Sequence, residues 1–128
     1  QWQLGKIYLH GEGCAVNAPI AVNWFHQAGE KDHAMALFDL AECYVHGIGV
    51  ETNNQMGLKY HEQAARLGNR ESQFIAAASY LNGIGTAVNI PTAITYLELA
   101  AYQGHVGAAA LLQEYSKPRS RRNSNSSP

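Results

Sequence analysis

The chain has 128 residues, of which 46% are hydrophobic and 15% charged, a composition that can build one packed domain and excludes a wholly disordered chain. The formal net charge is −1, but residues 117–128 hold four basic and no acidic side chains, so residues 1–116 carry −5. A mildly acidic body argues against nucleic acid as the main partner, because phosphate binding needs a cationic face. No apolar run approaches the roughly 18 residues of a membrane span, so no direct membrane insertion is expected.

The first ten residues predict a helix, because Leu4, Ile7 and Tyr8 follow one another at spacings of three and four. This pattern is already under way at the start of the sequence, which does not open with methionine. We therefore expect the chain to be part of a longer protein with similar segments upstream, where any targeting segment would also lie.

The motif that ends this helix recurs twice. Three copies share a tyrosine and two glycines at a constant spacing of 36 residues: Tyr8, Gly11 and Gly13; Tyr44, Gly47 and Gly49; Tyr80, Gly83 and Gly85. Glycine readily adopts the left-handed backbone that closes a helix, so each motif predicts a helix end. A fixed period of this length is typical of a solenoid, and it gives these residues a structural role.

A second helix follows each motif. Its expected N-cap is an asparagine in every copy, at Asn17, Asn53 and Asn89. Each second helix also combines a small residue with larger ones: Ala21 with Trp24 and Phe25, Gly57 with Tyr60 and His61, and Ala93 with Tyr96 and Leu97. Each helix pair therefore presents apolar surface on both sides and must stack on its neighbours to bury it.

Polar residues mark where these second helices end and the next helices begin. The expected ends are Gly68 and Gly104, with Asp32 at that place in the first copy, and the following helices begin at His33, Asn69 and His105. The predicted fold is all-α, an α-solenoid over residues 1–116 with repeats at about 1–36, 37–72 and 73–108. A final helix at 105–116 is expected to cap it. Residues 117–128 lack hydrophobic side chains and are expected to form a disordered, basic, serine-rich tail.

The turn and packing residues resemble those of the Sel-1-like repeat, a helical repeat close to the tetratricopeptide repeat. The resemblance covers residues 1 to about 116, and in the second copy it rests on Leu40-Ala41, Tyr44, Gly47-x-Gly49-Val50, Asn53, Tyr60, Ala64-Ala65 and Gly68. It implies a right-handed superhelix of paired helices that acts as a non-catalytic scaffold or adaptor for a protein or peptide, as part of a larger regulatory protein.

Three positions on the first helix of each repeat form one stripe, on the side opposite the packing residues. The stripe reads Gln3, Lys6 and His10 in the first copy, Asp39, Glu42 and His46 in the second, and Ile75, Ala78 and Asn82 in the third. If these helices line the concave face, as the resemblance implies, the stripe is the candidate binding groove. A merely solvated face is the alternative, which Ile75 beside Ala78 disfavours. Charge reversal at Asp39 and Glu42 is expected to abolish binding with stability nearly unchanged.

The cysteine and histidine residues predict neither a disulfide nor a metal site. Cys14 and Cys43 occupy small apolar positions of different repeats, about 10 Å apart, whereas a disulfide needs Cα atoms within about 7 Å. Two free thiols favour a reducing, cytoplasmic compartment. His10 and His46 are a full repeat apart and cannot share a zinc ion, so no metal and no cofactor is expected.

Two other functions are alternatives to the adaptor hypothesis. Some secreted bacterial relatives are described as β-lactamase-like, but their paired cysteines are missing here, and no GxSxG, P-loop or SxxK motif is present. A purely structural spacer is the other reading. In the tail, Ser124 follows two arginines and Ser127 precedes a proline, patterns typical of phosphorylation sites.

Overall fold

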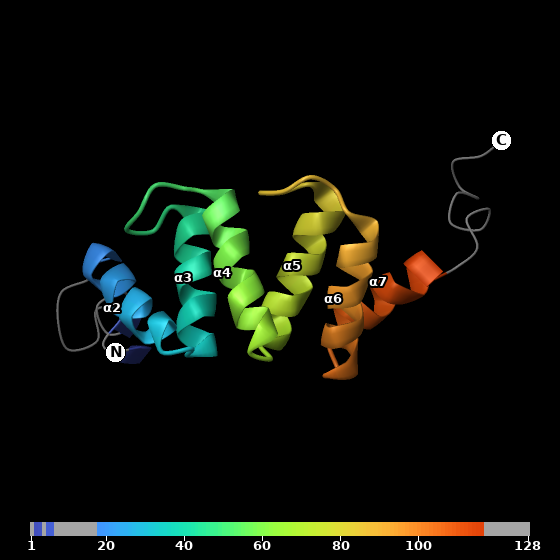
Figure 1. The fold of residues 1–128 in the computed structure, drawn as a ribbon, viewed down its shortest axis with the longest axis horizontal. Helices are drawn as coiled ribbons and strands as arrows, with labels where there is room; N and C mark the ends of the chain where they lie inside the picture. The colour runs from blue at the N-terminus through green and yellow to red at the C-terminus, as the bar shows by residue number, and fades with distance from the viewer. Residues whose placement is uncertain (1, 4, 7–17, 117–128) are drawn as a thin grey trace.

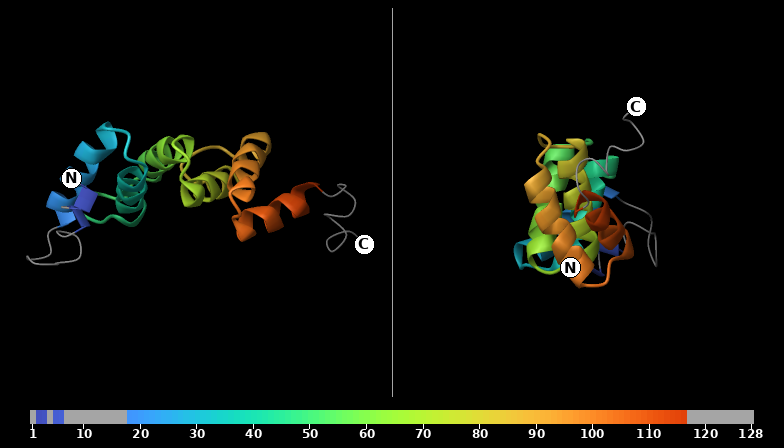
Figure 2. Two further views of the ribbon diagram at one scale, coloured as in Figure 1. Left: turned by 90° about the horizontal axis from the view of Figure 1, so that it is seen from below. Right: turned by 90° about the vertical axis from the view of Figure 1, so that its right-hand side faces the viewer.

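The computed structural model describes residues 2–3, 5–6 and 18–116. Across residues 18–116 the helices are α2 (Ala18–Glu30), α3 (Ala34–His46), α4 (Asn54–Arg66), α5 (Arg70–Asn82), α6 (Ile90–Tyr102) and α7 (Val106–Ser116). They stand side by side in chain order and form one elongated row (Figures 1 and 2). Each helix packs mainly on the helices just before and after it. The row confirms the predicted all-α solenoid.

The predicted N-caps are confirmed wherever the structure describes them. The side chains of Asn53 and Asn89 accept hydrogen bonds from the backbone N–H groups of Met56 and Thr92, each three residues further on. Asn69 caps α5 in the same way, and His33 caps α3 through its Nδ1 atom. These side chains satisfy backbone donors that have no partner inside the first turn of a helix.

The predicted helix ends are also confirmed. Gly47 and Gly83 have φ angles of 69° and 70°, and their N–H groups donate to the carbonyls of Cys43 and Ser79. Asp32, which stands where the later repeats have glycine, has a φ of 58°. The turns between α2 and α3 and between α4 and α5 each have three residues, and the middle one has a positive φ angle whether it is Asp32 or Gly68. Tyr8, Gly11, Gly13, Cys14 and Asn17 lie outside the described residues.

Two apolar clusters hold the row together. The first joins α2 to α3 through Ala21, Val22, Phe25, Leu40 and Cys43, and the second joins α5, α6 and α7 through Ala77, Leu97, Ala100 and Ala108. Cys43 is a free thiol, 1% exposed, and burial raises its pKa to about 11, with the nearby Asp39 and Glu42 carboxylates adding to the effect. This thiol is a packing residue and is not activated as a nucleophile.

Tyrosine pairs join the helices on either side of each long turn. Tyr44 of α3 stacks on Tyr60 of α4 with ring centroids 5.6 Å apart, and Tyr80 of α5 stacks on Tyr96 of α6 at 6.1 Å. The preceding repeat supplies a polar partner for each pair. His26 Nε2 lies 3.3 Å from the Tyr44 hydroxyl. In the second pair, the Glu62 carboxylate accepts hydrogen bonds from Tyr80 at 3.2 Å and Tyr96 at 2.7 Å. The residue 18 positions before each α3 or α5 tyrosine thus links successive repeats.

Candidate functional site

The structure divides the predicted stripe into two groups. Gln3, Lys6 and Asp39 lie around Trp2, whose indole N–H donates to the Asp39 carboxylate while the Lys6 ammonium lies 4.9 Å from the ring centroid. Glu42, His46, Ile75 and Ala78 gather further along the row. Asn82 is exposed at the end of α5, and His10 lies outside the described residues, as do Ser124 and Ser127.

Two members of the second group, Ile75 and Ala78, line a cavity of about 180 Å³ between α3, α4 and α5, which we call the α3–α5 cavity. Its lining is Val45, Asn54, Leu58, His61, Phe74, Ile75, Ala78, Ser79 and Ile84. Most of these side chains are apolar, and they come from three helices and the turn after α5. Ile75 and Ala78 therefore line an apolar cavity, where the sequence suggested a surface stripe.

A chain of four polar side chains runs from this cavity to the surface. His61 is fully buried, and its Nδ1 atom lies 3.2 Å from the hydroxyl of Ser72, also fully buried. Its Nε2 atom lies 3.2 Å from Glu42 Oε1, although the alignment is too poor for a hydrogen bond, so Nε2 has no hydrogen-bond partner within the described residues. The other Glu42 oxygen lies 2.9 Å from Nε2 of His46, whose side chain is 59% exposed. Glu42, at 29% exposure, connects the buried and the exposed imidazole.

The two buried positions of this chain of side chains, His61 and Ser72, are polar only in the central repeat. At the position of His61 the other repeats have Phe25 and Leu97, both fully buried. At the position of Ser72 they have alanine, Ala36 and Ala108, and at the position of Glu42 they have Lys6 and Ala78. Apolar residues therefore fill the two buried positions in the same fold, and burying polar groups there costs stability that apolar packing avoids. We interpret the three residues as a feature of the central repeat that serves something other than packing.

One expectation from the sequence needs correction. Glu42 was expected to lie in a stripe where charge reversal leaves stability nearly unchanged, but its carboxylate lies 3.2 Å from the fully buried imidazole of His61. The sequence did carry a signal for a buried polar network: histidine replaces Phe or Leu, and serine 11 residues later replaces alanine. Charge reversal at Glu42 is therefore expected to lower stability as well as to alter binding, because it would place an ammonium group beside His61.

Glu42→Gln is expected to reduce the loss of stability in acid. The neighbouring His61 ring, assisted by His46, lowers the pKa of Glu42 below its ordinary value of 4.5, although partial burial opposes this. A lowered folded-state pKa contributes stability that is fully present above the unfolded pKa and is lost as the pH falls through the folded pKa. Urea unfolding at pH 7 and pH 3 should therefore show a smaller difference for Glu42→Gln than for the wild type. The exposed Glu51→Gln should behave like the wild type, and the same pH difference in all three proteins would contradict the role of Glu42.

The arrangement of Ser72, His61 and Glu42 does not favour a catalytic or metal-binding site. Serine, histidine and glutamate occur together, as in hydrolases, but Ser72 has no exposed surface that a substrate could reach. Within residues 2–3, 5–6 and 18–116, no group of three His, Cys, Asp or Glu side chains is placed to hold a metal ion. None of the described helices is long and apolar enough to cross a membrane. Recognition of another molecule is the chemistry that the cavity suits best.

Comparison with known proteins gives three consecutive matches to the family model of the Sel1 repeat, at residues 1–33, 34–69 and 70–105. A Sel1 repeat protein from Oxalobacter formigenes is 31% identical, with a TM-score of 0.82 over 88% of this chain and 85% of that one. A protective antigen of uropathogenic Escherichia coli with an SLR fold is 25% identical, with a TM-score of 0.86 over 89% of this chain. The matched region spans 24% of that antigen.

A third solved structure shares the fold at lower identity. Cysteine rich protein B from Helicobacter pylori is 18% identical, with a TM-score of 0.75 over 87% of this chain and 86% of that one. The comparison with curated proteins gave no match.

Proposed function

The chain belongs to the Sel1 repeat family, whose members generally serve as protein-interaction scaffolds, and we propose that it is a non-catalytic module that binds a peptide segment of a partner protein at the α3–α5 cavity. The observation that carries the proposal is the cavity itself, an apolar space of about 180 Å³ beside the predicted stripe. An engineered apolar cavity of about 150 Å³ takes up benzene, so a space of this size suits one aliphatic or aromatic side chain.

The charges around the cavity favour a basic partner. Glu42 keeps a lowered pKa and is ionised at neutral pH, and residues 1–116 carry a formal charge of −5. A lysine or arginine next to the apolar anchor would meet the Glu42 carboxylate, and complementary charges contribute to specificity and association rate. The expected ligand is therefore an extended or helical segment with one large apolar side chain and a neighbouring basic residue. We expect the module to work within a larger adaptor or regulatory protein.

The proposal is tested by selecting peptides from a random library on the immobilised full chain. Selected peptides should share an apolar anchor next to a basic residue. They should lose most of their affinity for Ala78→Leu, in which the larger side chain occupies the cavity. Ala110→Leu is the matched control, because it makes the same change at an exposed position of α7 outside the cavity. Unfolding curves of both variants separate lost binding from lost fold.

Two outcomes would reject this function. One is that no peptide motif is enriched over an unrelated helical protein. The other is that the selected peptides bind Ala78→Leu and Ala110→Leu with equal affinity while both variants remain folded, which would place recognition away from the α3–α5 cavity.

A further inference from the structure

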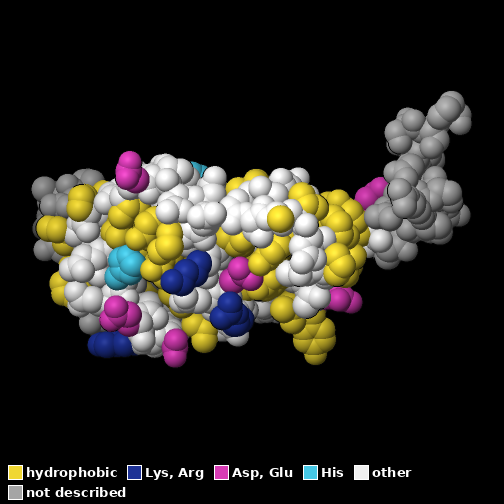
Figure 3. All heavy atoms as spheres, turned by 45° about the horizontal axis from the view of Figure 1, so that its top comes forward, with side chains coloured by type: hydrophobic (Ala, Val, Ile, Leu, Met, Phe, Trp, Pro, Cys, Tyr) yellow, Lys and Arg dark blue, Asp and Glu magenta, His cyan; other side chains and the backbone are white. Residues whose placement is uncertain are grey.

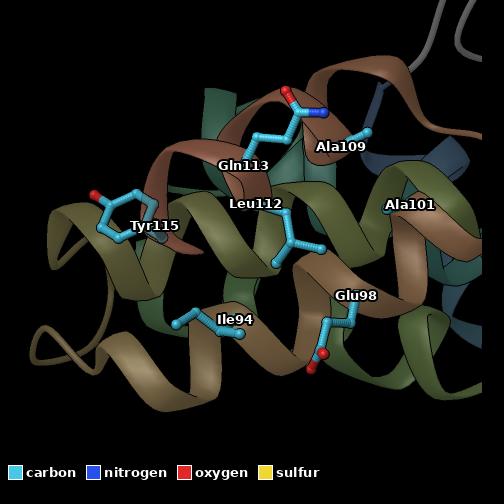
Figure 4. Close-up of a pocket in the computed structure, with 7 residues that line it drawn as sticks. All are labelled: Ile94, Glu98, Ala101, Ala109, Leu112, Gln113 and Tyr115. Atoms are coloured by element: carbon cyan, nitrogen blue, oxygen red, sulfur yellow. The ribbon is translucent and has the colours of Figure 1, made fainter. Parts of the chain in front are cut away.

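A second and larger groove lies at the C-terminal end of the row, between α6 and α7. Its volume is about 490 Å³, and it is lined by Ile94, Glu98, Ala101, Ala109, Leu112, Gln113 and Tyr115. Leu112 reaches from α7 toward the α6 residues Ile94 and Glu98 (Figure 4). We call this site the α6–α7 groove. It is separate from the α3–α5 cavity and shares no lining residue with it.

One repeat earlier, most of the equivalent positions are covered by a helix. The residues 36 positions before Ala101, Ala109, Leu112 and Gln113 are Ala65, Gln73, Ala76 and Ala77, and each is at most 4% exposed. Helix α6 packs here: Leu97 and Ala100 join Ala77 in one apolar cluster, and the Gln103 amide donates to Gln73 at 2.9 Å. The α6–α7 groove therefore corresponds to the place that α6 fills on α4 and α5.

The equivalence between the two repeats also includes a polar residue, Glu98. It lies one repeat after Glu62, whose carboxylate accepts the hydroxyl protons of Tyr80 and Tyr96. Glu98 is exposed and makes no hydrogen bond or ion pair to the described part of the chain. A carboxylate thus stands at the edge of the groove in the position that, one repeat earlier, receives a tyrosine from the covering helix.

An apolar surface extends the groove outward. Leu99, Tyr102 and Val106 are 46%, 93% and 83% exposed. One repeat earlier, the same positions hold Gln63, Arg66 and Arg70, which suit contact with water. Hydrophobic side chains gather over the α6–α7 end on the face shown in Figure 3. A contiguous exposed apolar patch on a folded protein is typical of an interaction site.

We propose that the α6–α7 groove docks an amphipathic helix of a partner protein, and that this helix repeats the pattern of α6. The pattern is a small residue, then a tyrosine three positions later, an aliphatic residue after it, and a second small residue seven positions after the first, as in Ala93, Tyr96, Leu97 and Ala100. The tyrosine hydroxyl would donate to Glu98.

The pattern argues for a different protein as the occupant. In this chain the small residues and large apolar residues of α2 and α6 are already buried inside the row, among them Ala21, Phe25, Ala93 and Leu97. Among the described helices, a second folded copy therefore offers no such face. Residues 117–128 have no apolar side chain apart from two prolines, which makes them a poor match for an apolar groove.

A labelled peptide with the sequence of residues 89–103, from the N-cap asparagine of α6 to Gln103, is the probe for this site. Fluorescence anisotropy should show saturable binding to the full chain. Ala109→Arg should weaken binding at least about tenfold, because the side chain enters the groove. Ala110→Arg makes the same change on the next residue of α7, which is exposed but does not line the groove, and should leave affinity within about twofold.

The role of Glu98 is tested by a double-mutant cycle. Tyr96→Phe in the peptide should weaken binding to the wild-type chain, and this preference for tyrosine should disappear with Glu98→Ala, which removes the acceptor. Absence of saturable binding, or equal losses for Ala109→Arg and Ala110→Arg, would overturn the proposal. A concentration-dependent dimer that forms in sedimentation velocity and is abolished by Ala109→Arg would also overturn it, by making a second copy the occupant. Peptides selected on the α3–α5 cavity should bind Ala109→Arg normally, so the two sites succeed or fail separately.

Discussion

Gly85→Ala is expected to lower the free energy of unfolding by about 3 kcal/mol, the sum of backbone strain and a clash with the preceding repeat. Gly85 has a φ angle of 75°, a backbone conformation that residues other than glycine adopt only at a cost in free energy. A Cβ atom here would lie 2.5 Å from the carbonyl oxygen of Asn54, in the first turn of α4. Because that oxygen belongs to a helix backbone, relief requires the third repeat to move away from the second.

Gly104→Ala is the matched control for this prediction. Gly104 has a φ angle of 85°, but no atom lies within 4 Å of its added Cβ. Its loss should reflect backbone strain alone, about 1 kcal/mol. Urea unfolding of the two variants measures the difference, which isolates the contact between repeats. If both variants lost the same free energy of unfolding, the turn after α5 would not be in tight contact with α4.

Phe25→Ala is expected to cost about 3–5 kcal/mol, the range for removing a fully buried phenylalanine ring. Phe25 is 0% exposed and packs in one cluster with Val22 and Leu40. A Cβ atom on Gly5 would lie 2.6 Å from the ring, so the ring fills the space up to the backbone of that residue. Alanine would therefore leave a cavity between this cluster and the Gly5 backbone.

Phe25→Leu separates the loss of volume from the loss of the aromatic ring. Leu97 occupies the same position in the third repeat and is also 0% exposed, so leucine is compatible with the local backbone. Its cost should stay below about 1.5 kcal/mol. Thermal and urea unfolding of Phe25→Ala and Phe25→Leu measure the two losses of unfolding free energy and so test this difference. A Leu variant as unstable as the Ala variant would show that this position depends on the ring and not on volume.

The local structure of the solenoid could be predicted from the sequence. Asn53, Asn69 and Asn89 cap helices as expected, and Gly47 and Gly83 close them. These features involve residues within one helical turn of one another, where a side chain either reaches a backbone group or does not. A constant period then extends one correctly predicted repeat to the others.

The candidate site was only partly predictable. Among the stripe positions, Glu42 pairs with His46, and Ile75 and Ala78 line one cavity, but nothing in the sequence indicated that cavity. The network of Glu42, His61 and Ser72 also went unrecognised, since its members come from three helices, α3, α4 and α5. Comparing the copies position by position would have pointed to it, because the positions of His61 and Ser72 are polar in the central repeat alone.

By itself, the sequence determined the helices, their ends, the repeat and the family, because short-range hydrogen bonding and apolar periodicity decide them. Only the tertiary structure decided which residues of different repeats meet. The second glycine of the turn touches the preceding repeat, as Gly85 does at Asn54, and Glu62 receives two tyrosines from the repeat that follows it. Such contacts depend on the rotation and spacing between successive helices, and a repeat period fixes neither. Because α7 is the last of the described helices, none of them covers Glu98 and the α6–α7 groove.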